Sequence, residues 1–117
     1  MTWLPIFEIA SKDFEKDISA LKKILGGFER QIHYKDGYKF SPEGQFAMGW
    51  WFYTIYVKTG FIRELVTHHH SINHRVKDER AILKMVQEQL KQQKSTARAK
   101  FHGQKPIFAR YWSWLMR

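Results

Sequence analysis

Four histidines within seven residues come nearest to a chemical site: His68, His69, His70 and His74. On a helix, His70 and His74 would lie one turn apart, a spacing that suits two ligands of a divalent ion. Asp78 continues this line, but a straight helix cannot wrap three such residues around one ion. The pattern therefore favours exposed histidines at a helix junction, and it leaves open whether they bind a metal.

The sequence contains no motif for covalent or phosphate chemistry. It lacks cysteine, a Gly-x-Ser-x-Gly motif and a Gly-Lys-Ser/Thr phosphate loop. Asp13, Glu15 and Asp17 fall in the first turns of an expected helix, where acidic side chains are favoured. We therefore expect no enzyme activity and no cofactor.

Positive charge is concentrated in the second half of the chain. Residues 61–117 contain twelve Lys and Arg residues against four acidic ones, a net charge of +8, whereas residues 1–60 have a net charge of +1. No acidic residue follows Glu88. A one-sided excess of this kind attracts polyanions or acidic protein surfaces.

Several of these basic residues are predicted to share one side of a helix. Arg80, Lys84 and Lys91 recur at spacings of four and seven residues. Cations of this kind neutralise phosphates, and aromatic rings stack on unpaired bases. A solvated helix face would carry similar charges, but the missing acids favour binding. The predicted nucleic-acid-binding residues are Arg75, Lys77, Arg80, Lys84, Lys91, Lys94, Arg98, Lys100, Lys105, Arg110, Trp112 and Trp114.

The elements expected to position these residues are helices. Ser11 is the expected cap of a first helix that ends at Gly26-Gly27. Ser41-Pro42-Glu43 is typical of a second helix start, and the following residues are apolar on nearly all sides. The sequence thus predicts a mainly α fold, a compact bundle of four to five helices around a central aromatic-rich helix at about 42–59. Lys35-Asp36-Gly37 indicates either a short β-hairpin at about 28–40 or an irregular loop.

The basic half should continue the bundle. We expect helical pieces at 61–70 and 72–90, a helical extension over 91–100, and a last short helix that begins at Pro106. Leu83, Val86 and Leu90, together with the C-terminal aromatic residues, could also pair two copies of the chain. The apolar run 46–57 is shorter than the roughly 20 residues of a membrane span, so we expect no membrane contact.

With 117 residues and 44% hydrophobic residues, the chain is expected to form one domain. The start of the sequence does not resemble a signal peptide, which favours a cytoplasmic protein. Our leading hypothesis is a small non-catalytic nucleic-acid-binding accessory or regulatory protein that uses a basic helix face at about 75–105. The alternative is a protein–protein interaction module, an inhibitor, adaptor or assembly subunit, that docks on an acidic partner surface.

Overall fold

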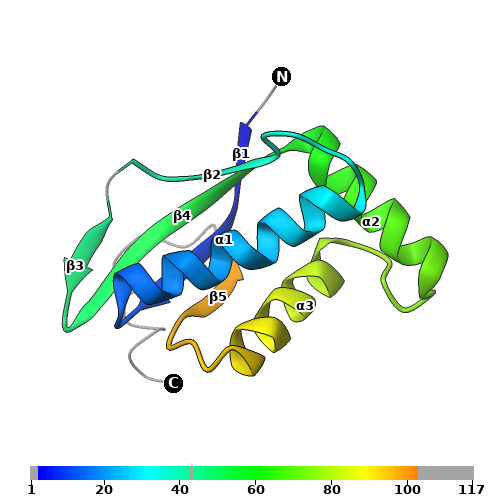
Figure 1. Ribbon diagram of the computed structural model, residues 1–117. Helices are drawn as coiled ribbons and strands as arrows, with labels where there is room; N and C mark the ends of the chain where they lie inside the picture. The colour runs from blue at the N-terminus through cyan, green and yellow to red at the C-terminus, as the bar shows by residue number, and fades with distance from the viewer. Residues whose placement is uncertain (1–2, 43, 103–117) are drawn as a thin grey trace.

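The computed structural model describes residues 3–42 and 44–102, and within them the chain has a mixed α/β fold (Figure 1). The helices are α1 (Phe14–Gln31), α2 (Thr59–Ile72) and α3 (Glu79–Gln92). The strands are β1 (Trp3–Ser11), β2 (Tyr38–Phe40), β3 (Gln45–Ala47), β4 (Trp50–Lys58) and β5 (Arg98–Phe101). The predicted mainly α bundle is therefore wrong.

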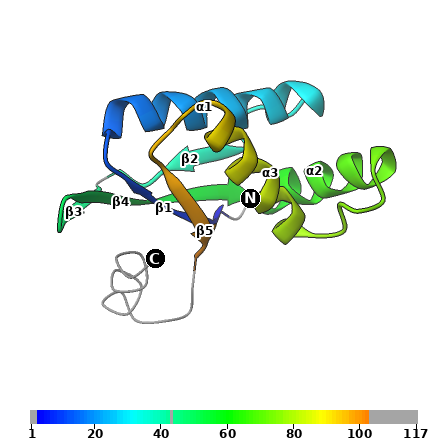
Figure 2. The ribbon, with the colours of Figure 1, turned by 90° about the horizontal axis from the view of Figure 1, so that it is seen from below.

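The strands form one antiparallel sheet in the order β2-β4-β1-β5, and β3 also pairs with β4. The two long strands β1 and β4 make its centre, with Trp3 opposite Lys58 and Ser11 opposite Trp51. Figure 2 shows α1 lying along one face of the sheet. Strands β1 and β5 are thus neighbours in the sheet, although about 90 residues separate them along the chain.

The central helix expected at about 42–59 is instead the hairpin of β3 and β4. Ala47 pairs with Trp50, and Met48 and Gly49 between them have φ angles of 54° and 84°. Two positive φ angles in a two-residue loop are the geometry of hairpin turns that follow the twist of the strands. The run Trp50–Lys58 is rich in aromatic and β-branched residues, which favour strands. Its aromatic residues occupy both faces, which hid the alternation typical of a strand.

The first helix is longer than expected, and the predicted hairpin at 28–40 is wrong. Helix α1 begins after Asp13, whose carboxylate accepts a hydrogen bond from the Lys16 N–H at 3.3 Å, and continues through Gly26-Gly27. Because Phe28 is fully buried in the core, its packing outweighs the low helix propensity of the two glycines. The next strand, β2, pairs with β4 and not with residues 28–34.

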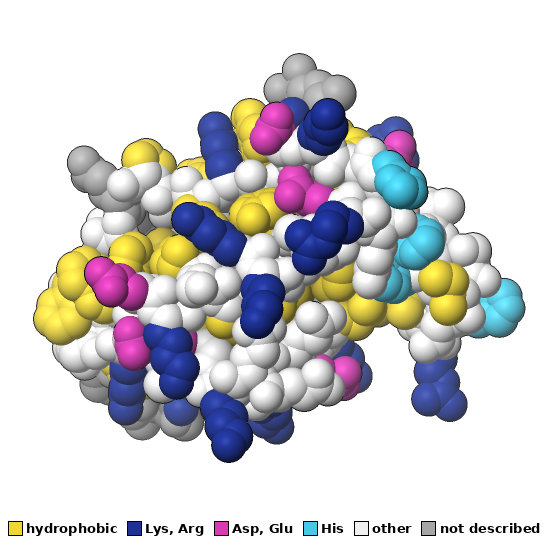
Figure 3. Space-filling view, viewed as in Figure 1, with side chains coloured by type: hydrophobic (Ala, Val, Ile, Leu, Met, Phe, Trp, Pro, Cys, Tyr) yellow, Lys and Arg dark blue, Asp and Glu magenta, His cyan; other side chains and the backbone are white. Residues whose placement is uncertain are grey.

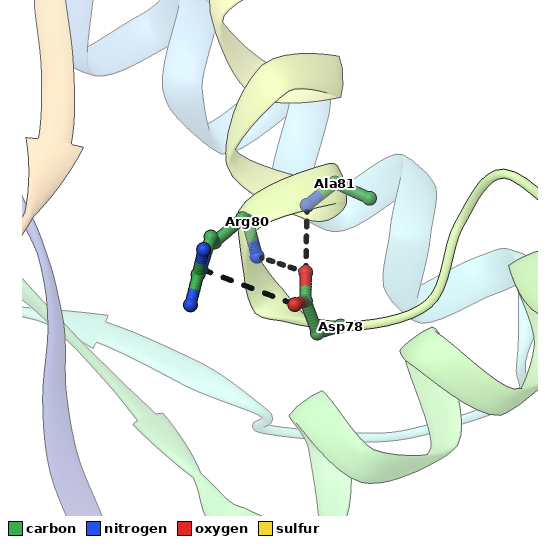
Figure 4. A network of polar contacts seen from close by, with 3 residues as sticks. All are labelled: Asp78, Arg80 and Ala81. Atoms are coloured by element: carbon green, nitrogen blue, oxygen red, sulfur yellow. Dashed lines mark hydrogen bonds and ion pairs between the residues drawn. The ribbon is translucent and has the colours of Figure 1, made fainter.

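Helix α3 begins later than the pattern from Ile72 suggested. The Asp78 carboxylate accepts hydrogen bonds from the N–H groups of Arg80 and Ala81 at 3.0 and 3.4 Å, and the Arg80 side chain lies 3.9 Å from it (Figure 4). Asp78 is thus the N-cap. The predicted helical extension over 91–100 is also wrong, since this stretch ends in β5. The helix expected from Pro106 lies outside the described residues.

A small buried cluster, Ala10 and Phe52, lies on the side of the sheet away from the helices. The main core lies between the helices and the other face of the sheet. Its buried members from the helices are Leu21, Ile24, Leu25, Phe28, Phe61, Ile62, Leu65, Ile82, Leu83, Val86 and Leu90, and those from the strands include Phe7, Ile9, Tyr53, Ile55, Val57 and Ala99. Leu83, Val86 and Leu90, named above as a means of self-association, are thus core residues of one molecule. Gly37 is packed so closely that a Cβ atom there would lie 2.5 Å from the Phe61 ring.

Candidate nucleic-acid interface

The sheet has two chemically different faces, because successive side chains of a strand point to opposite sides. In β4, Tyr53, Ile55 and Val57 point into the core. We call the opposite side the open face, meaning the side of the sheet that bears Trp50, Phe52, Thr54, Tyr56 and Lys58 of β4 and the residues paired with them. Those paired residues are Trp3, Pro5, Glu8 and Ala10 of β1, Lys39 of β2, Gln45 and Ala47 of β3, and Arg98 and Lys100 of β5. Its cations and the rings of Trp3, Trp50 and Tyr56 are exposed or half-buried, whereas Glu8, Ala10 and Phe52 are buried.

A groove of about 510 Å³ lies beside this face, where α3, the loop after it and β5 meet the end of the β3–β4 hairpin. We call it the basic groove. Three cationic side chains line it, Lys12, Lys91 and Arg98, and the Trp50 ring lies among them. None of the described residues that line the groove is acidic. It therefore combines positive charge with one aromatic surface.

The Trp50 ring orders two of these cations. The Lys12 ammonium lies 4.9 Å from the ring centroid, and the Arg98 guanidinium lies 5.1 Å from it. Contacts of this kind contribute about 0.5–1 kcal/mol at exposed sites. Since the cations come from the β1–α1 corner and from β5, the ring fixes two distant segments of the chain relative to each other.

A buried carboxylate holds the wall of the groove in place. Asp17 of α1 is fully buried and accepts hydrogen bonds from the hydroxyls of Ser11, Ser95 and Thr96, each at 2.5 Å. It also accepts one from the Thr96 N–H at 3.1 Å. The Thr96 hydroxyl oxygen in turn accepts hydrogen bonds from the N–H groups of Lys12 and Asp13, both at 3.3 Å. This network joins the β1–α1 corner to the α3–β5 loop, the two segments that present Lys12 and Arg98.

The hydrogen bonds, burial and charge at this site also shift the pKa values of Asp17 and Tyr53. Burial raises the pKa of Asp17, but the hydrogen bonds from Ser11, Ser95 and Thr96 prevail and bring the pKa below its ordinary value. Tyr53 of β4 has a raised pKa, because burial and the negative charge of Asp17 both disfavour the phenolate. At neutral pH the site therefore contains an ionised Asp17 and a neutral Tyr53.

A second group of cations and rings lies on the open face, at the other end of β4. The Lys39 ammonium lies 4.6 Å from the Trp3 ring and 5.9 Å from the Tyr56 ring, and the Lys58 ammonium lies 5.1 Å from the Trp3 ring. We call these four residues the distal cluster. They bring together the beginning of β1, β2 and the end of β4, which are far apart in the sequence.

The structure brings only some of the predicted binding residues to this surface. Lys91 and Arg98 line the groove, and Lys100 lies in the next position on the open face of β5. Arg80 and Lys84 are exposed on α3, Arg75 in the loop before it, and Lys94 just after it. Lys77 lines a separate hollow with Asp78 and Glu79. Lys105, Arg110, Trp112 and Trp114 lie outside the described residues.

The helix side of the molecule has a different distribution of charge. Figure 3 shows its Lys and Arg side chains scattered over the surface and interspersed with acidic ones, while the histidines gather at the end that bears α2. This pattern resembles an ordinary solvated surface. The basic helix face that the sequence suggested therefore also carries acidic side chains on this side of the molecule.

The histidine cluster packs partly within the protein. The His69 ring meets the Phe28 ring edge-on at 5.7 Å, and burial, followed by the neighbouring His68, lowers the pKa of His69. The His70 Nδ1 atom lies 3.0 Å from the Val76 carbonyl oxygen, within hydrogen-bond distance, and its ring lies 5.5 Å from that of His74. Within residues 3–42 and 44–102, no three His, Asp or Glu side chains are arranged to hold an ion.

Sequence reasoning missed Lys12, Trp50, Lys39, Lys58 and Trp3. Trp50 was assigned to a buried helix, and the others lie outside the basic half of the chain. The signal available was the alternation of Trp50, Phe52, Thr54, Tyr56 and Lys58 after a turn that contains Gly49, which a strand interpretation would have placed on one face.

Comparisons with protein-family models, with curated proteins and with solved structures found no match to this chain. The helices in the described part of the chain are too short or too polar to cross a membrane.

Proposed function

We propose that this protein is a small non-catalytic nucleic-acid-binding protein, an accessory or regulatory factor, whose contact with the phosphate backbone is centred on the basic groove. One observation supports this most: Lys12, Lys91 and Arg98 line the same groove, and Lys12 and Arg98 both contact the Trp50 ring, with no acid among the described lining residues. Three converging cations suit a chain of phosphates, and contacts of this kind gain free energy from counterion release.

The other predicted cations extend this contact along the molecule. Lys94 and Lys100 lie near the groove in sequence, and Arg75, Lys77, Arg80 and Lys84 provide further positive charge around α3. The absence of cysteine in all 117 residues fits a reducing compartment, and we propose the cytoplasm.

The test is binding of the full chain to labelled single-stranded and double-stranded DNA and RNA, from about 50 to about 200 mM salt. Lys91→Gln/Arg98→Gln removes two groove cations. We expect it to bind more weakly and to lower the salt slope by about 1.4 for a single strand or about 1.8 for a duplex. Lys22→Gln/Lys23→Gln removes two exposed cations from α1 and should change neither.

The alternative, docking on an acidic protein, gives a different result. An acidic polypeptide such as polyglutamate presents carboxylates to the same cations. A well-folded protein that binds polyglutamate at about 50 mM salt, but binds none of the four nucleic acids there, would contradict nucleic-acid binding and favour the interaction module.

A further inference from the structure

The open face carries cations along its whole length, and not only at the groove. Antiparallel pairing places the residues of neighbouring strands in rows across this face. The rows contain Trp3 with Lys58, then Lys39 with Tyr56, then Thr54 with Glu8 and Lys100, and then Phe52 with Ala10 and Arg98; Trp50 follows at the end. Each of the four rows contains a cation.

Aromatic rings accompany the cations at both ends of this face. Trp50 marks one end of the face and Tyr56 and Trp3 the other, each with at least one ammonium or guanidinium group within 5.9 Å of its ring. The eight residue steps from Trp50 to Lys58 along β4 span about 26 Å. The basic groove and the distal cluster thus lie at the two ends of this side of the sheet, and the buried residues Glu8, Ala10 and Phe52 lie between them.

The acidic content of this surface is low. Glu8 is the one acidic residue among the described strand positions on the open face, and its carboxylate lies 3.1 Å from His102 Nδ1. It is also largely buried, with 9% of its surface exposed. The face therefore presents mainly positive charge to an approaching ligand.

Rings on a sheet face and cations beside them suit unpaired bases better than a duplex. An unpaired base offers its flat surface for stacking, whereas a paired base is stacked inside the helix. Duplex DNA is read mainly by an element that enters the major groove. The obvious helix for that role, α3, has its exposed Arg80 beside Asp78 and lies on the side where basic and acidic groups are mixed (Figure 3).

We infer that the ligand is a single-stranded nucleic acid that bridges the basic groove and the distal cluster. This inference rests on the proposed function and specifies its substrate class and its path. The strand's phosphates would contact Lys12, Lys91 and Arg98 at one end and Lys39 and Lys58 at the other. Its bases would stack on Trp50 and Tyr56.

The test compares strands of two lengths with the duplex. The probes are fluorescently labelled oligonucleotides of about 4 and about 16 nucleotides, lengths that span the range of single-strand site sizes, and the longer one annealed to its complement. We expect the full chain to bind the long single strand at least about tenfold more tightly than the duplex at equal salt.

Variants of the distal cluster test the path. Lys39→Gln/Lys58→Gln should weaken binding of the long strand about tenfold and lower its salt slope by about 1.4, with little effect on the short one. Tyr56→Leu should weaken the long strand by a similar factor, because it removes one stacking surface. Lys22→Gln/Lys23→Gln is the charge-matched control, and circular dichroism shows whether each variant is folded.

The outcomes separate this inference from the proposed function. If the duplex binds as tightly as the strand, or if the distal variants bind the long strand like the parent while Lys91→Gln/Arg98→Gln does not, the single-strand path is wrong and the groove remains. An equal loss with Lys22→Gln/Lys23→Gln would also overturn the path. If no nucleic acid binds at about 50 mM salt, the proposed function fails as well.

Discussion

The two faces of the sheet differ although the same strands build both. On the helix side, Ile55 and Val57 are at most 1% exposed and pack against α1, α2 and α3. On the open face, their neighbours Tyr56 and Lys58 are half-buried and lie near charged or aromatic groups. The helix-side residues therefore supply most of the core. The open-face residues supply a small buried cluster, Ala10 and Phe52, and the charged and aromatic groups at its two ends. Substitutions of adjacent residues can separate the two roles.

The largest contrast is expected between Ile55→Ala and Tyr56→Ala. Ile55 is fully buried, so its truncation should lower the free energy of unfolding by about 2–5 kcal/mol. Tyr56→Ala should cost less than about 1 kcal/mol, because its side chain is not in the core, but it should weaken binding to a long single strand. Urea denaturation and strand-binding titrations measure both effects. Equal losses of stability would show that Tyr56 contributes to packing as much as Ile55 does.

Asp17 joins the β1–α1 corner to the α3–β5 loop beside the groove. Asp17→Asn should lower the free energy of unfolding by about 2–3 kcal/mol, because four hydrogen bonds to a buried carboxylate lose their ionised acceptor. Binding should weaken as well, because the loop that carries Ser95 and Thr96 would no longer be fixed beside Lys12.

The same substitution gives a pH test. The pKa of Asp17 is lower in the folded protein than in the unfolded chain, so its contribution is complete above about pH 4 and is lost as the pH falls through the folded pKa. The difference in unfolding free energy between the parent and Asp17→Asn should therefore shrink below about pH 4. A difference that stays constant down to about pH 2.5 would contradict an ionised, hydrogen-bonded Asp17.

Gly37 tests how closely the helix side is packed. Its N–H donates to the Glu29 carboxylate at 2.8 Å, its carbonyl accepts from the Lys58 N–H at 2.9 Å, and the Phe61 ring lies against its Cα. Gly37→Ala should lower the free energy of unfolding by about 1–3 kcal/mol through overpacking. In Gly44→Ala, the added Cβ would meet its nearest atom at 3.5 Å, an ordinary contact. A thermal melt of both variants checks this, and an equally harmless Gly37→Ala would contradict the close packing.

The smallest effect is expected at His69. Burial lowers its pKa in the folded state, so protonation opposes folding. The stability associated with neutral His69 is complete above its unfolded pKa of about 6.5 and is lost as the pH falls below that value. His69→Gln should therefore lose less stability than the parent between about pH 7 and pH 5. His33→Gln, a change at an exposed histidine in a turn, is the control. Thermal melts of the parent and of both variants at each pH measure the loss of stability.

Local signals in the sequence predicted parts of the helices but not the sheet. Two predicted apolar stripes do lie in helices, Leu21 and Leu25 in α1 and Leu83, Val86 and Leu90 in α3. They could be recognised because the apolar residues of an amphipathic helix recur about every 3.6 residues. The strand β4 was mistaken for a helix because both of its faces carry large apolar side chains. The helical propensity near Lys91 did not reveal that Arg98 would pair with Ala10, a contact between distant segments.

The candidate surface was also predicted only in part, because contacts between distant segments create it. Lys91 and Arg98 stood out because they belong to a basic half of the chain. Lys12, Lys39 and Lys58 lie in the balanced half. The fold brings Lys12 beside Arg98 and Trp50, and it brings Lys39 and Lys58 beside Trp3 at the other end of β4. Charge counted along a sequence therefore predicted part of the candidate surface but not its position on the sheet.

The most direct test of the two-face account is nuclear magnetic resonance of the ¹⁵N-labelled full chain during titration with an unlabelled single strand. The indole N–H signals distinguish the two faces. We expect those of Trp50 and Trp3, on the open face, to shift strongly, and that of Trp51, which packs against Phe14 and Phe46, to shift little. Shifts confined to α1 and the exposed side of α3, with Trp50 and Trp3 unchanged, would contradict the assignment of binding to the open face.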